Sequence, residues 1–330
     1  MSEVALKGRD LPGGEVAPRT AVLKRLRTHD TIFRLVTRTA ALIVLAILSG
    51  VILALIIGSM PALRSFGLSF VTTEVWNPVT EQFGALAPIY GTLVTSIIAM
   101  VIAVPMGLLV AFFLTELCPL WLRRPIAIAI ELLAGIPSII YGIWGLFIFA
   151  PFLQQYVQPY LIAAFGDVPL LSSVFEGPPY GIGMLTAGLI LAIMVLPFIT
   201  SISRDVFDAV PPVLKEAAYG IGSTRWEVFR YVVLPYTRVG VIGGVMLGLG
   251  RALGETMAVT FVIGNAHNIS ASILAPGTTI SATIANEFTE AVGDVYTSSL
   301  IALGLILFVI TFIVLAIARY MLSRIQKRLG

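Results

Sequence analysis

Two charged side chains lie inside an otherwise apolar run of this sequence. Arg251 and Glu255 interrupt residues 239–264, a run long enough to cross a bilayer. Charges at that depth usually face a cavity or a protein partner, and at a spacing of four these two would share one face of a helix. Arg251 could guide an anion through a translocation path, because a guanidinium matches the geometry of oxyanion oxygens, with Glu255 holding it and tempering its charge. Alternatively, the two form a structural ion pair that locks helices together.

The same run is rich in small residues. Six of its glycines lie around the two charges, at positions 240, 243, 244, 248, 250 and 254. Small side chains let neighbouring helices or another subunit approach closely within a membrane. We therefore expect this run to pack against protein, with its two charges turned away from lipid.

The composition indicates the environment of these side chains. The 330 residues are 58% hydrophobic and 12% charged, with a mean hydropathy of +0.97. An ordinary soluble domain has about 25% charged residues, and no soluble interior could hold this excess of apolar side chains. A cytosolic enzyme, a secreted disulfide-bonded scaffold and a disordered chain are therefore excluded. The single cysteine, Cys118, allows no intrachain disulfide and no cysteine zinc cluster.

Charge-poor apolar runs predict six membrane-spanning helices, because a helix needs about 20 apolar residues to cross the hydrocarbon core. We expect an all-α integral membrane protein with helices near residues 39–58, 88–114, 125–150, 181–203, 239–264 and 297–318. The six-span domain would occupy residues 39–320, between a cytoplasmic N-terminal segment, residues 1–38, and a cytoplasmic tail, residues 321–330.

Basic residues predict the orientation. Nineteen of the 21 Lys and Arg residues fall in the N-terminal segment, two connecting loops and the stretch that follows the sixth span. Arg64 falls on the other side, and Arg251 falls within a span. Because Lys and Arg remain in the cytoplasm, both termini are expected there. Residues 21–38 alternate apolar and basic side chains at helical spacing, which predicts an amphipathic helix on the inner membrane surface. A solvated basic leader that only sets the topology is the alternative.

The loop between the fourth and fifth spans has the pattern of a helix, a turn and a second helix. Pro212 suits the first turn of a helix, and Gly222 suits a left-handed turn after it. Thr224 and Glu227 then form a capping box for a second helix, which we expect to end at Pro235. A loop that only connected two spans would not need such order.

This loop, residues 204–238, resembles the EAA loop of ABC importer permeases. The matching residues are Glu216, Ala217, Ala218, Gly222, Val232, Leu234 and Pro235, with valine where isoleucine is commoner. In that family the loop forms a coupling helix that sits in a cleft of the ATP-binding subunit. The resemblance implies that the two alanines keep the helix slim, that Glu216 contacts the ATPase and that Gly222 permits the tight turn. An ordinary amphipathic loop helix is the alternative.

Three further segments, residues 134–151, 247–265 and 303–316, resemble the PstC family of phosphate-specific ABC importer permeases. The resemblance implies a type I ABC importer fold in the bacterial inner membrane, with this chain forming half of a translocation path for inorganic phosphate. It implies a second permease (PstA-like), a dimer of ATP-binding subunits (PstB-like) and a periplasmic phosphate-binding protein (PstS-like). In the family, the arginine and glutamate that match Arg251 and Glu255 are implicated in phosphate passage.

Missing motifs narrow the alternatives. The sequence has no G-x-x-x-x-G-K-[ST] phosphate loop, so we expect ATP hydrolysis on a separate subunit and no enzyme activity in this chain. It has no nucleophile elbow or metal-binding helix motif for an intramembrane hydrolase. We expect no cofactor, no metal and no nucleic-acid partner. An importer of another small anion, such as molybdate or sulfate, remains an alternative, as does a secondary transporter, which would leave the EAA-like loop unexplained.

Overall fold

The computed structural model describes residues 19–166, 168, 169 and 171–327, and most of them are helical. Residues 1–18 of the predicted N-terminal segment and residues 328–330 of the tail lie outside the described residues. The elements, with π-helices labelled η, are α1 (Arg19–Phe66), α2 (Ser69–Thr72), β1 (Trp76–Asn77), β2 (Gln82–Phe83), α3 (Leu86–Phe112), η1 (Phe113–Leu117), α4 (Leu120–Ala134), α5 (Ser138–Trp144), η2 (Gly145–Phe149), α6 (Ala150–Phe152), η3 (Leu153–Val157), α7 (Gln158–Phe165), α8 (Ser172–Phe175), α9 (Met184–Asp208), α10 (Pro212–Gly220), α11 (Arg225–Val228), η4 (Phe229–Val233), α12 (Leu234–Leu253), α13 (Met257–Val262), α14 (Ile280–Glu287) and α15 (Asp294–Lys327).

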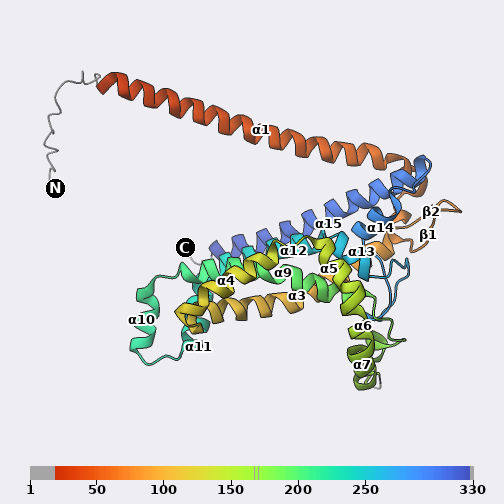
Figure 1. Cartoon of the computed structure of the whole chain (residues 1–330). Helices are drawn as coiled ribbons and strands as arrows, with labels where there is room; N and C mark the ends of the chain where they lie inside the picture. The colour runs from red at the N-terminus through yellow and green to blue at the C-terminus, as the bar shows by residue number, and fades with distance from the viewer. Residues whose placement is uncertain (1–18, 167, 170, 328–330) are drawn as a thin grey trace. The chain divides into compact units, whose positions relative to one another are not determined.

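The chain divides into two units, residues 1–54 and 55–330. In the first unit, residues 19–54 belong to one uninterrupted helix, α1 (Figure 1). The helix predicted over residues 21–38 is therefore the beginning of α1 and not a separate element. Whether that part lies on the inner membrane surface stays a prediction. The side chains of the apolar stretch that follows are almost all exposed, as expected for a helix surrounded by lipid.

The predicted number of spans and the all-α class are confirmed. Six helices of the described chain are long and apolar enough to cross a membrane: His29–Phe66, Leu86–Leu117, Ser138–Phe165, Met184–Asp208, Arg225–Leu253 and Asp294–Arg324. The strands form one small antiparallel pair, in which Trp76 lies opposite Phe83. The side of the membrane on which each terminus lies stays a prediction.

The third span lies further along the chain than the predicted residues 125–150. A separate helix, α4, ends at Ala134, and the spanning helix begins only at Ser138. The interruption contains Gly135 and Pro137. Proline has no N–H to donate and disfavours helical conformation in the residue before it, so the apolar run is divided into two helices.

The fifth span also differs from the predicted residues 239–264. It begins at Arg225, passes through η4 and continues as α12 to Leu253. Pro235, expected to end a helix, instead lies in the first turn of α12, where a missing N–H costs little. Residues 254–256 are not helical, and the short α13 covers most of what remains of the predicted run.

The second unit is built around α9, which packs against α3, α12 and α4. Within an apolar stretch of 18 residues in α9, 61% of the residues are buried. The packing is close enough to require glycine: a Cβ at Gly188 would lie 2.5 Å from Cγ2 of Ile98, and one at Gly248 would lie 2.9 Å from Cγ1 of Val195. These contacts bring α3, α9 and α12 together along their lengths.

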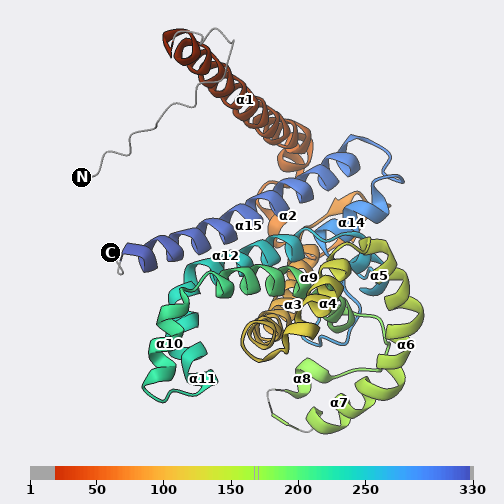
Figure 2. The same ribbon diagram turned by 60° about the vertical axis from the view of Figure 1, so that its left-hand side comes forward.

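Within the second unit, α10 and α11 project at one end, while β1, β2 and α14 lie at the other (Figures 1 and 2). The EAA-like loop and the loop around α14 are therefore separated by the length of the helices between them. This arrangement places three groups of candidate residues at different depths: one at each end and one inside the fifth span.

Candidate functional site

Arg251 and Glu255 do not share a helix face as predicted. Arg251 lies in the last turn of α12, which ends at Leu253, and Glu255 lies in the non-helical segment that follows. Gly254 caps the helix between them. Neither charge takes part in an ion pair with a described residue, so the predicted brace between the two is not formed in this conformation.

The guanidinium of Arg251 lies over an aromatic ring instead. Its Cζ atom is 4.6 Å from the ring centroid of Phe198, which belongs to α9. The Nε atom of Arg251 is buried and has no hydrogen-bond partner within the described chain. Contact with a ring face compensates part of the cost of removing a cation from water but satisfies none of its N–H groups. The arrangement therefore leaves a positive charge without a carboxylate partner, and an unsatisfied Nε donor, among the described residues.

The glycines of the fifth span divide between two faces. A Cβ at Gly240, Gly244 or Gly248 would lie 2.6 to 2.9 Å from side chains of α9. Gly243 and Gly250, by contrast, have nothing within 4 Å of such an atom. The expected close packing is confirmed for the first face. The second face is open within this chain and suits the approach of another subunit.

The EAA-like loop has the predicted turn and capping box. α10 ends at Gly220, and Gly222 adopts a φ of +89°, which side-chain-bearing residues rarely adopt. The backbone N–H of Thr224 donates to Oε2 of Glu227 at 2.7 Å, and the N–H of Glu227 donates to Oγ1 of Thr224 at 3.3 Å. The reciprocal bonds satisfy two donors at the start of α11.

The matched residues of the loop fall into two groups. Glu216 and Ala217, on α10, are exposed, and so are Gly222 and Pro235, which follow α10 in the chain. Ala218 and Leu234 instead pack against a buried apolar cluster. The cluster consists of Ala111, Phe112, Phe207, Val210, Val228, Phe229, Val233 and Val241. No side chain of α10 is buried. Exposed apolar residues accompany Glu216: Val213 is 70% and Ile221 is 86% exposed. The helix thus presents a mixed apolar and acidic surface that suits a protein partner.

Ion pairs that the sequence did not indicate tie the elements at this end together. Nζ of Lys215 lies 2.6 Å from Oε1 of Glu116, and these side chains are only 18% and 9% exposed. Arg123 pairs with Asp208 at 2.5 Å, and Arg204 pairs with Glu131 at 3.0 Å. The sequence signal for Glu116 is its position as the first charge after the apolar run 82–115. Its partner, nearly 100 residues away, could be found only from the fold.

A second unpredicted group lies at the opposite end, around the carboxylate of Glu287. Oε2 accepts hydrogen bonds from Nε1 of Trp76 at 2.5 Å and the hydroxyl of Tyr296 at 2.8 Å, and Oε1 lies 3.0 Å from Nε2 of His267. The rings of Trp76 and His267 are stacked, with centroids 5.4 Å apart. Burial raises the pKa of Glu287, but the bonds from His267, Tyr296 and Trp76 outweigh it, so the pKa is lowered. This carboxylate joins the β1–β2 hairpin, the loop after α13, α14 and α15.

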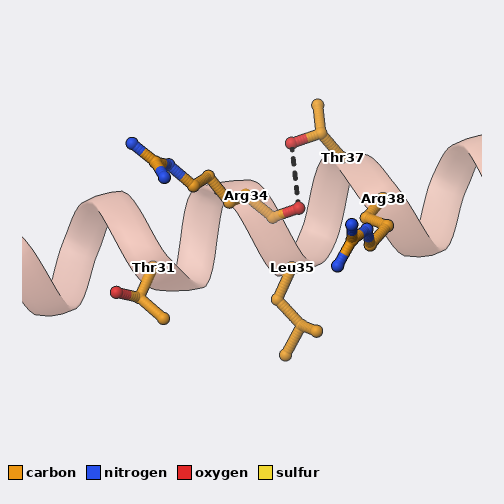
Figure 3. A pocket seen from close by; sticks show the side chains of 5 residues that line it. All are labelled: Thr31, Arg34, Leu35, Thr37 and Arg38. Atoms are coloured by element: carbon orange, nitrogen blue, oxygen red, sulfur yellow. Dashed lines mark hydrogen bonds between the residues drawn. The ribbon is translucent and has the colours of Figure 1, made fainter.

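The first unit contains a shallow hollow on α1, shown in Figure 3. Its lining residues are Thr31, Arg34, Leu35, Thr37 and Arg38. Arg34 forms an ion pair with Asp30 at 3.0 Å, one turn earlier. All the lining residues belong to one helix, so the hollow is an open surface and not an enclosed site.

A family model matches residues 103–327, which cover the end of α3 and every element from η1 to α15. Its description is the inner membrane component of binding-protein-dependent transport systems. The match includes the EAA-like loop, Arg251 and Glu255.

The chain is similar to curated relatives along nearly their whole length. It is 70% identical to the phosphate transport system permease protein PstC of Mesorhizobium japonicum, with 94% of this chain and 95% of the relative covered. It is 56% identical to the PstC protein of Pasteurella multocida, with 94% and 97% covered.

Among solved structures, the chain resembles a subunit of a bacterial ABC transporter involved in the import of the acidic polysaccharide alginate. The TM-score is 0.61, the identity is 16%, and the match covers 92% of this chain and 99% of that one. At this identity the likeness concerns the fold, which is that of an ABC importer permease.

Proposed function

This chain belongs to the family of inner membrane components of binding-protein-dependent transport systems, and from that premise we propose that it is the permease subunit of an ATP-driven importer of inorganic phosphate. The observation that carries the proposal is the 70% identity to a phosphate transport permease over 94% of the chain. In the proposed complex it pairs with a second permease, a dimer of ATP-binding subunits and a periplasmic phosphate-binding protein.

The EAA-like loop docks the ATP-binding subunit in this proposal. α10 supports that role because it projects from the second unit (Figure 2). None of its side chains is buried, and Glu216 and Ala217 are exposed. Gly222 makes the turn, and Ala218, Leu234 and Pro235 connect the loop to the fifth span. Movement of the ATP-binding subunits would then reach α12 directly through η4.

Arg251 receives phosphate along the translocation path in this proposal. Its cation lies within the fifth span with an unsatisfied Nε donor and an aromatic face beneath it. Glu255, just beyond the end of α12, keeps the local charge low enough for phosphate to leave. Selection among anions falls to the periplasmic partner, so this site needs to pass phosphate and not to hold it tightly.

A growth and uptake assay tests the proposal. The gene is introduced, with those of its partner subunits, into a strain that lacks its own ATP-driven phosphate importer, and uptake of radiolabelled phosphate is measured at low external concentration. We expect uptake to be restored and to persist in a large excess of sulfate or molybdate. Uptake of sulfate or molybdate in place of phosphate would contradict the proposed substrate.

A further inference from the structure

The EAA-like loop needs a connection that carries its movement into the membrane. α10 contacts α11 and η4, but none of its side chains is buried, so apolar packing holds it weakly. The closest polar contact of α10 with a distant part of the chain is the bond between Lys215 and Glu116. Glu116 lies in η1, the π-helical continuation of α3.

One face of α10 is directed at this carboxylate. Lys215 and Tyr219 are four residues apart and therefore lie on the same side of the helix, while Glu216 lies on the exposed side. Tyr219 also interacts with the Glu116 carboxylate: burial raises the pKa of the tyrosine hydroxyl, and the negative charge of Glu116 raises it further. Arg225, at the start of α11, donates to the carbonyl oxygen of Glu116 at 3.4 Å. Both helices of the loop thus converge on one residue.

The other end of α3 is fixed to the loop that precedes α14. A Cβ at Gly91 would lie 1.9 Å from the carbonyl oxygen of Thr278, so the two backbones are in direct contact. Oγ1 of Thr92 accepts a hydrogen bond from the N–H of Ile280 at 3.0 Å. α3 therefore runs from the EAA-like loop at one end of the unit to the α14 region at the other, and it packs along α9 between them (Figure 1).

We propose that Glu116 is the positioning residue through which the docking helix moves the second span: its ion pair with Lys215 makes α10 and α3 shift together. The inference rests on the proposed function, because it presupposes that α10 docks the ATP-binding subunit. An ion pair shielded from solvent suits the transmission of movement because both partners are held at fixed positions. Separating them would leave an unpaired charge with little access to water. A link of this kind changes transport only through the movement of the elements that it joins.

The test compares variants in the complete complex, reconstituted in proteoliposomes with the second permease, the ATP-binding subunits and the binding protein. Glu116→Gln and Lys215→Met each remove one charge. In the double variant Glu116→Lys with Lys215→Glu, the two charges exchange places. Asp208→Asn, which breaks the Arg123–Asp208 pair at the same end of the unit, is the matched control. ATP hydrolysis, its stimulation by the phosphate-loaded binding protein, and uptake of radiolabelled phosphate are measured together.

We expect both single variants to retain the ATP-binding subunits and to hydrolyse ATP, but to import about tenfold less phosphate per ATP. Stimulation by the binding protein should fall in parallel, the exchanged pair should recover part of the coupling, and Asp208→Asn should behave as the unaltered chain. A purely structural role would lower the amount of complex without changing the ratio of uptake to hydrolysis.

Two results would overturn the inference: a normal ratio of uptake to hydrolysis in Glu116→Gln, or an equal loss of coupling in Asp208→Asn. If the single variants do not assemble, the test rests on the double variant with exchanged charges. An assembled double variant should couple ATP hydrolysis to uptake, and one that assembles without coupling refutes the link. A complex of unaltered chains that imports no phosphate contradicts the proposed function itself. Coupled import by both the unaltered chain and Glu116→Gln contradicts only the role of Glu116.

Discussion

Replacing Arg251 by glutamine separates its two possible roles because the structure gives them different magnitudes. Among the described residues the guanidinium has no carboxylate partner, so Arg251→Gln strands no opposite charge there. The substitution removes the contact with the Phe198 ring, worth about 0.5–2 kcal/mol. If Arg251 and Glu255 formed a buried brace, breaking it would cost about 3–5 kcal/mol. A charged hydrogen bond from Arg251 to phosphate is worth about 1.5–3 kcal/mol. At 1.4 kcal/mol for each factor of ten, its loss slows uptake by about 10- to 150-fold.

The assay pairs thermal unfolding of the detergent-solubilised complex with uptake of radiolabelled phosphate. We expect Arg251→Gln to assemble, to unfold within about 5 °C of the unaltered complex, and to lose most of its uptake. Arg238→Gln is the matched control, because it removes the same group from the same helix near its N-terminal end. Its Nε is likewise buried without a partner among the described residues. Two results would refute the guiding role. One is a large loss of stability in Arg251→Gln with uptake that falls only in proportion to the amount of folded complex. The other is full uptake by Arg251→Gln.

Three further predictions concern the loops and the topology. Gly222→Val should abolish uptake, because φ at this position is +89°. Gly220→Val should retain most of the uptake, because an added Cβ there meets nothing within 4 Å. Equal uptake by the two variants would contradict the role of the turn. The lowered pKa of Glu287 means that its stabilisation is present above the usual value of 4.5 and is lost as the pH falls through the lower folded value. Acid should therefore reduce the melting temperature of the unaltered complex more than that of Glu287→Gln. If the difference in melting temperature between the unaltered complex and Glu287→Gln is the same at about pH 7 and in acid, the proposed contribution of the Glu287 carboxylate is excluded. A reporter fused after residue 280 should be periplasmic, and one after residue 222 cytoplasmic; a cytoplasmic signal at 280 would mean that the fifth span does not cross.

Hydrophobic runs were enough to predict the number of spans, because each span needs an apolar length that few other structures require. The capping box at Thr224 and Glu227 and the turn at Gly222 were also predictable. Those features depend on local backbone chemistry, which neighbouring residues specify almost completely.

Span boundaries were less predictable, because hydropathy does not show where the backbone changes direction. Without its structural context, Pro235 predicts the end of a helix, yet it lies in the first turn of α12, directly after η4. Gly254 caps α12 inside a continuous apolar run and so separates Arg251 from Glu255. The link between Glu116 and Lys215 depends on the packing of α3 beside the EAA-like loop and has no local signal.

The most direct test of phosphate import by this chain is uptake into proteoliposomes that contain the complete complex, with the ATP-binding subunits and the binding protein on opposite sides of the membrane. Radiolabelled phosphate should accumulate only when ATP is supplied to the ATP-binding subunits and the phosphate-loaded binding protein is present, and excess sulfate or molybdate should not reduce it. Accumulation without ATP, driven by an ion gradient, would contradict the account.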